Sequence, residues 1–398
     1  MPLGGLSRLL HHSRQSTPRS GLAEVSAALA LGRLDGRVAS MGHRVERIFA
    51  ARIVRMVLVD ALRSEGHAFT DARFHSWFAG LSTLSDEPSR SARPPRTMCL
   101  AILTELNHSG WAPMAELARA MLPALLAPAD HFETATSSED AHQEVHAVLA
   151  VARSLLTSIG VRQEPDPSAE LCELHDAIGA DVTFTHQEPI FSSLPCGPIG
   201  AKPRHLVSRP PRPPLWALDL LWGERLFAQG LMSVPLPFPG LVKPMTENVD
   251  DLDQPDPVSE VAAALRHSAE RLIAALKDAD VAVRTIVDGQ LCHRNTSRAP
   301  MIFGILAGFG QLRGAQLEAI IGASRLGTRK MLSTLEKSGL LHQTRTAGAD
   351  LFSVRLKAEA RSVVDRGKDT PALSREALDD YDTSMAAIDA LLARIGAH

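Results

Sequence analysis

Aromatic side chains are scarce in this chain. They make up 4% of its 398 residues, and tyrosine occurs once. Alanine and leucine therefore supply much of the apolar surface, and both residue types favour helices over strands. The overall balance, 45% hydrophobic and 22% charged residues, is ordinary for a globular chain. The composition predicts a mainly α protein that is long enough for two or three domains with cores of their own.

Cysteines and long apolar runs are also few. The four cysteines are far apart and form no Cys-x-x-Cys pair, which excludes a zinc ribbon and a disulfide framework. The longest apolar stretch, around residues 301–312, is shorter than the run of about 18 residues that a membrane span needs. We therefore expect a cytoplasmic protein without membrane contact. Residues 1–20 contain three arginines and no acid, and we interpret them as a flexible basic arm rather than a transit peptide.

Motifs of the common enzyme classes are absent as well. No glycine-rich phosphate loop is present, and the glycines between residues 304 and 314 fit helix packing and turns better than a dinucleotide-binding loop. Serine, histidine and acidic residues occur without a nucleophile elbow to connect them. The sequence predicts no catalytic residues and no cofactor.

The most informative stretch is residues 297–354, which begins with three expected helices. Pro300 stands in the first turn of the first helix, which continues through an apolar run. A second helix is predicted over residues 314–321 from Leu317, Ile320 and Ile321 at helical spacing. Gly322-Ala323-Ser324 is the predicted turn, in which glycine allows a positive φ and Ser324 caps a third helix over residues 325–338.

The third helix has two different faces when it is projected at 100° per residue. Thr328, Met331, Leu332 and Leu335 form the expected core face. The opposite face carries cations and small polar groups, as a helix that reads the major groove requires. Two questions stay open: whether the cations serve base edges or phosphates, and whether Leu326 meets a thymine methyl or a neighbouring loop. With the tip of the hairpin described next, the predicted DNA-binding residues are Ser324, Arg325, Leu326, Arg329, Lys330, Ser333, Lys337 and Arg345.

A short β-hairpin is predicted after these helices. Residues 340–345 and 351–354 form its strands, residues 346–349 its turn, and Arg345 lies close to the tip. Residues 297–345 contain seven Lys/Arg and two Asp/Glu, whereas the whole chain has a net charge of −3. The Gly-Ala-Ser turn and the Leu-Glu-Lys-Ser-Gly-Leu-Leu ending resemble winged helix-turn-helix regulators, although Thr328 stands where such helices usually carry Val, Ile or Leu. A concentrated positive charge is typical of nucleic-acid binding.

A helical domain is predicted over residues 21–130. This prediction rests on an apolar stripe at helical spacing, formed by Val45, Ile48, Phe49 and Ile53, and on a further helix that Thr70 can cap. The sequences Leu-Asp-Gly-Arg-Val at residues 34–38 and Ala-Phe-Thr-Asp at residues 68–71 resemble the front of Fic-related proteins. The resemblance covers residues 40–130 and 255–355 and is to uncharacterised bacterial proteins that join such a region to a helix-turn-helix. The His-Pro-Phe catalytic signature is absent, so the resemblance does not imply AMP transfer.

Residues 131–256 form an acidic and proline-rich middle region. His142 and His146 lie four apart on an expected helix, a spacing that suits a metal, but a solvated acidic helix is the better interpretation and we predict no metal site. Proline density between residues 189 and 244 predicts extended chain, interrupted by a short helix at residues 215–229 whose tryptophans are expected to dock on the core. Basic residues at 202–212 offer a second interpretation, an arm on DNA.

Two further helices complete the prediction. A long helix over residues 257–296, with a kink, is either a spacer or a dimerisation helix, and an amphipathic helix within residues 357–398 either pairs two copies or packs on its own chain. We predict a sequence-specific bacterial transcriptional regulator that binds double-stranded DNA, with a homodimer as one arrangement. The alternative is a helical adaptor whose winged helix contacts protein.

Overall fold

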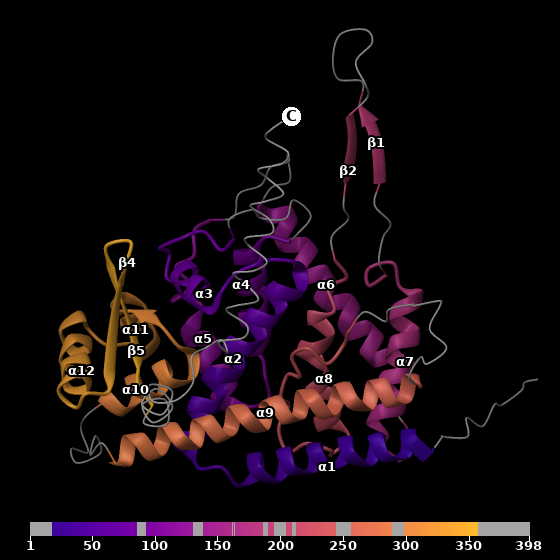
Figure 1. Cartoon of the computed structure of the whole chain (residues 1–398), viewed down its shortest axis with the longest axis horizontal. Coiled ribbons are helices and arrows are strands. Elements are labelled where there is room, and N and C mark those ends of the chain that lie inside the picture. Colours follow the sequence, from indigo (N-terminus) through magenta and orange to yellow (C-terminus); the bar gives the residue numbers. More distant parts are fainter. Residues whose placement is uncertain are drawn as a thin grey trace, which may run out of the picture. The chain divides into compact units, whose positions relative to one another are not determined.

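The computed structural model describes residues 18–85, 93–129, 138–160, 162, 164–185, 190–194, 204–208, 212–243, 256–288 and 298–356. Within them the chain is mainly helical, as predicted (Figure 1). The elements are α1 (Pro18–Ser40), α2 (His43–Glu65), α3 (Asp71–Phe78), α4 (Pro95–Asn107), α5 (Ala112–Met121), α6 (Ser138–Ser158), α7 (Pro167–Ala180), β1 (Ile190–Leu194), β2 (Arg204–Ser208), α8 (Trp216–Ala228), α9 (Pro257–Asp288), α10 (Ala299–Phe309), β3 (Leu312–Arg313), α11 (Gly314–Ile321), α12 (Arg325–Lys337), β4 (Leu341–Thr346) and β5 (Ala349–Val354). Residues 1–17 of the predicted arm and the predicted C-terminal helix lie outside the described residues.

The core is built around α2. Its side chains Phe49, Ile53, Leu58 and Leu62 have no exposed surface, because α4, α5, α8, α9 and α10 all pack on this helix. Gly66 ends α2 with a φ of 106°, and its N–H donates to the carbonyl of Arg63. We call the described residues from α1 to α9 the helical body and residues 298–354 the winged segment; both belong to one compact unit that extends to Val354.

The long helix α9 is covered within its own chain. It packs along α1 and also contacts α2 and α7 (Figure 1). Its apolar stripe through Val261, Leu265, Leu272 and Leu276 is buried. This stripe therefore serves the core, and any dimerisation through α9 would have to use its other face.

The proline-rich stretch is anchored by α8. Trp216 and Trp222 are 3% and 0% exposed, which confirms that these tryptophans dock on the core. The buried carboxylate of Asp219 accepts hydrogen bonds from the N–H groups of Gly240 and Val242, each at 2.7 Å. Burial raises the pKa of Asp219 to about 7, against the opposing effect of these hydrogen bonds. The hairpin β1–β2, which pairs Ile190 with Ser208, was not predicted from the sequence.

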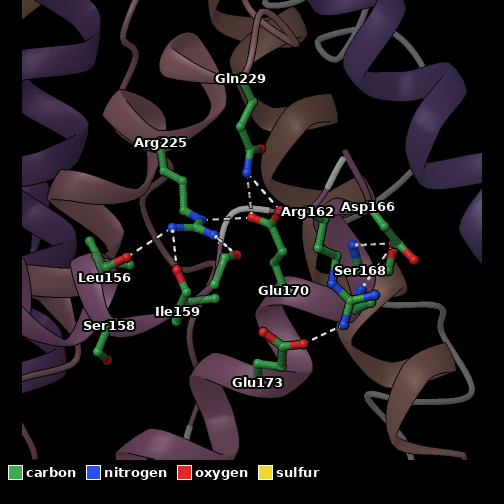
Figure 2. Close-up of polar contacts among 12 residues, drawn as sticks. Leu156, Ser158, Ile159, Arg162, Asp166, Ser168, Glu170, Glu173, Arg225 and Gln229 are labelled. Atoms are coloured by element: carbon green, nitrogen blue, oxygen red, sulfur yellow. Dashed lines mark hydrogen bonds and ion pairs between the residues drawn. The ribbon is translucent and has the colours of Figure 1, made fainter. Parts of the chain in front are cut away.

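A buried ion pair joins α7 to α8, and hydrogen bonds from the same arginine reach the end of α6 (Figure 2). The Arg225 Nε donates to Glu170 Oε2 at 2.6 Å, and Gln229 Nε2 donates to both oxygens of the same carboxylate. The other guanidinium nitrogens of Arg225 donate to the carbonyls of Leu156, Ile159 and Gly160. A cation at these carbonyls also compensates the negative end of the α6 dipole.

The winged segment is attached to the body through α10. Helix α10 can lie close to α2 because residue 308 is a glycine: a Cβ there would be 2.5 Å from the carbonyl oxygen of Ile48 in α2. The buried side-chain amide of Gln316 in α11 donates to the carbonyls of Phe78 and Ala124 at 3.1 and 2.7 Å. Most of α10 is buried, because it faces the body on one side and α11, α12 and β5 on the other.

Candidate nucleic-acid interface

The turn between α11 and α12 has the geometry that its residues predict. Gly322 adopts a φ of 63° and closes α11. Ser324 caps α12, because its Oγ accepts a hydrogen bond from the N–H of Gly327 at 3.2 Å. The cap uses this hydroxyl as an acceptor, so Ser324 fixes the start of the helix. Gly339, with a φ of 69°, follows the end of α12.

Helix α12 separates a buried face from a charged one. Thr328, Leu332 and Leu335 are 1%, 6% and 0% exposed, since α10, α11 and β4 cover this side. Their burial confirms the predicted core face, except that Met331 is only half-buried. The Thr328 Oγ1 is buried without a hydrogen-bond partner among the described residues.

The opposite face of α12 carries exposed cations. Arg325, Arg329, Lys330 and Lys337 are exposed and Ser333 is half-buried. Leu326 is 78% exposed, so it does not pack on a neighbouring loop. Arg325 and Lys337 begin and end the helix, and at 1.5 Å per residue they stand about 18 Å apart along its axis.

The predicted hairpin is present, with a shorter turn. β4 and β5 pair from Leu341 with Val354 to Thr346 with Ala349, which leaves Ala347 and Gly348 as a two-residue turn. Both have positive φ, 47° and 78°, the combination that joins twisted strands most directly. The exposed residues of β4, which include His342, Gln343 and Thr344 beside Arg345, extend the polar surface beyond the predicted set.

A third strand was missed. β3 pairs Leu312 with Phe352 and Arg313 with Leu351, which gives the sheet order β3-β5-β4. Two residues are too few to show a period in the sequence. The strand joins α10 to α11 and holds β5 against them, so it fixes where the hairpin stands relative to α12.

The cations of this surface are not compensated by carboxylates in the part of the chain that the structure describes. In the described parts of the chain, no Asp or Glu lies within 4.0 Å of the side-chain nitrogens of Arg325, Arg329, Lys330, Lys337 or Arg345, whereas body arginines such as Arg225 have carboxylate partners. The surface combines an exposed helix, a neighbouring strand and uncompensated positive charge. Such a surface suits a polyanion.

The histidine pair on α6 is the other candidate site. The Nε2 atoms of His142 and His146 are 3.0 Å apart, and burial together with the His142 charge lowers the pKa of His146. Glu144 pairs instead with Arg93 at 3.1 Å. No group of three metal-binding side chains occurs among the residues that the structure describes. That the pair binds no zinc stays a prediction.

Two comparisons with known proteins gave no match for this chain. No protein-family model matches it, and no curated protein matches it. Among the described residues, no helix has the length and apolar character to cross a membrane.

Proposed function

We propose that the protein is a bacterial transcriptional regulator that binds double-stranded DNA through its winged segment. The observation that carries this proposal is the exposed row of Arg325, Arg329, Lys330 and Lys337 on one face of α12, without a carboxylate partner in the described residues. In this arrangement α12 enters the major groove and Arg345 of the hairpin contacts the phosphate backbone. Leu326 then faces base edges, where an apolar side chain suits a thymine methyl.

A gel-shift titration of the full chain against genomic fragments tests the proposal. The full chain is required because α10 is buried against α2. A regulator retains one fragment above the others, and its affinity falls with salt. If the four α12 cations and Arg345 each neutralise a phosphate, the slope of log K against log salt is about −4.5, which is about −0.9 for each phosphate.

Two substitutions separate recognition from folding. Arg329→Ala should weaken binding by about 1–3 kcal/mol for the preferred fragment if the arginine reads a guanine, or equally for all fragments if it contacts phosphate. Arg33→Ala, an exposed arginine on α1, is the matched control and should bind as the parent does. Leu332→Ala should lower the melting temperature first, because it empties part of a core. An Arg329→Ala protein that folds and binds every fragment like the parent would refute the assignment of α12.

The second candidate is an adaptor that uses α12 to contact protein, and the exposure of Leu326, 78%, favours it. An apolar side chain surrounded by polar ones resembles the apolar core and polar rim of a protein interface. An adaptor should show neither fragment preference nor a steep salt dependence in the same titration.

A further inference from the structure

A pocket lies where the winged segment meets the helical body. It encloses about 480 Å³, within the range of roughly 300–1,000 Å³ that small-molecule sites occupy. Ile48 of α2 and Leu117 of α5 supply part of its wall from the body, and Ile305 of α10 and Ile320 of α11 supply part from the winged segment. We call it the junction pocket, since an occupant would contact both parts at once.

Its apolar wall is accompanied by positive charge. Arg44 and Arg47 come from the beginning of α2, and Arg298 is the N-cap residue of α10. Glu116 is the one carboxylate among its lining residues, so the charged groups of the described lining sum to +2. Arg47 and Arg298 are exposed and have no Asp or Glu partner within 4.0 Å in the described parts of the chain.

The composition of the pocket selects a class of ligand. An apolar body would displace water from the isoleucine and leucine side chains, and a carboxylate would form charge-assisted hydrogen bonds with the guanidinium groups. Arg298 also stands at the N-terminal end of α10, where the helix dipole adds positive potential. We propose that the junction pocket binds an amphipathic carboxylate, with its chain on the apolar wall and its head group at Arg47 and Arg298.

Calorimetric titration with dodecanoate, below its micelle concentration, tests this proposal on the full chain. Dodecanoate should bind with a stoichiometry of one, and dodecanol and acetate, which lack the charge and the chain respectively, should bind at least tenfold more weakly. The experiment contains no DNA, so its failure leaves the proposed DNA binding untouched, and the reverse also holds. Equal affinity for dodecanoate and dodecanol would overturn the proposal.

Variants locate the binding. The double substitution Arg47→Gln and Arg298→Gln should weaken dodecanoate binding at least tenfold, whereas Arg33→Gln on α1 should not change it. Ala120→Trp fills the pocket from α5 at a half-buried position and should abolish binding, whereas Ala28→Trp on the exposed side of α1 should not. Circular dichroism confirms that each variant folds. The arginine pair is exposed, so parental affinity in that folded double variant is sufficient to refute the site.

Discussion

Arginines in the helical body and cations in the winged segment are used in opposite ways. In the body, Arg225 and Arg93 bind the fully buried carboxylates of Glu170 and Glu65 at 2.6 and 2.7 Å. On α12, Arg325 and Arg329 point to solvent without a carboxylate partner among the described residues. The difference teaches that charge alone does not identify a binding surface. Several neighbouring cations without compensating carboxylates are the better indicator, because a cation already paired inside the fold has little to offer a polyanion.

The largest effect is expected for Arg225→Ala. This change leaves the buried Glu170 with Gln229 alone and removes the donor for three carbonyls of α6 and the residues after it. Removing one partner of a buried ion pair costs about 3–5 kcal/mol, which urea denaturation would measure as a lower free energy of unfolding. Arg162→Ala is the control, because Arg162 is exposed and its partner Glu173 is only half-buried, and pairs that solvent reaches contribute at most about 1 kcal/mol. Equal losses in the two variants would contradict the comparison.

The free energy of unfolding is expected to depend on pH through a histidine that lies where the body meets the winged segment. His75 is 4% exposed and lies against Gly310. Its pKa is lowered from 6.5 to about 4, mainly by burial and to a smaller extent by the positive charge of the nearby Arg55. Between these values the unfolded chain binds a proton that the folded chain does not, so stability falls as the pH falls from about 6.5 toward 4. At about 1.4 kcal/mol per unit the full loss is about 3 kcal/mol.

The measurement compares His75→Phe with the parent in urea denaturation across this pH range. The difference between the two free energies of unfolding should vary with pH, because the other titrating groups are common to both proteins. A difference that stays constant from pH 7 to pH 4 would show that His75 titrates normally in the folded state.

A smaller change, and an increase in the free energy of unfolding rather than a loss, is expected for Thr328→Val. The Thr328 hydroxyl is buried without a partner among the described residues, and a buried unsatisfied hydroxyl costs about 1–3 kcal/mol. Valine has nearly the same shape and helix propensity, so the variant should be more stable by about 1 kcal/mol in thermal denaturation. Thr334→Val is the control on the exposed face, where the hydroxyl donates to the carbonyl of Lys330 at 2.9 Å, and it should bring no such gain.

The smallest stability effect is expected for Arg329→Ala, although its effect on DNA binding should be large. An exposed substitution of this kind usually changes the free energy of unfolding by less than about 0.5 kcal/mol. Arg225→Ala and Arg329→Ala together compare the same substitution in a buried ion pair and on the exposed face of α12. A loss of several kcal/mol for Arg329→Ala would place this arginine among the structural ones.

The local structure of the winged segment could be predicted from the sequence. Gly322, Ser324 and Gly339 each indicate a helix boundary through their own backbone or side-chain chemistry. Helix α11 ends before Gly322, and α12 begins after Ser324 and ends shortly before Gly339. The apolar spacing on α12 likewise predicted that Thr328 and Leu332 are buried.

Contacts between distant residues could not be predicted. Arg225 and Glu170 are 55 residues apart, and nothing in either neighbourhood indicates the pairing. The junction pocket could not be predicted for the same reason, since part of its wall comes from α2 and α5 and part from α10 and α11, which are far apart in the sequence. Sequence patterns report on the periodicity of a single element, whereas these features arise from the packing of several.

The contact between α2 and α10 also determines when the winged segment can form. Arg52 in α2 donates to the carbonyl of Ala307 in α10 across 255 residues of sequence. At roughly 5–20 residues per second, the ribosome delivers the second partner roughly 10–50 s after the first. The winged segment, which is made later, thus completes its fold on a surface that the earlier-made α2 has already formed. In a nascent chain whose α2 has misfolded, α10 lacks the surface on which it packs.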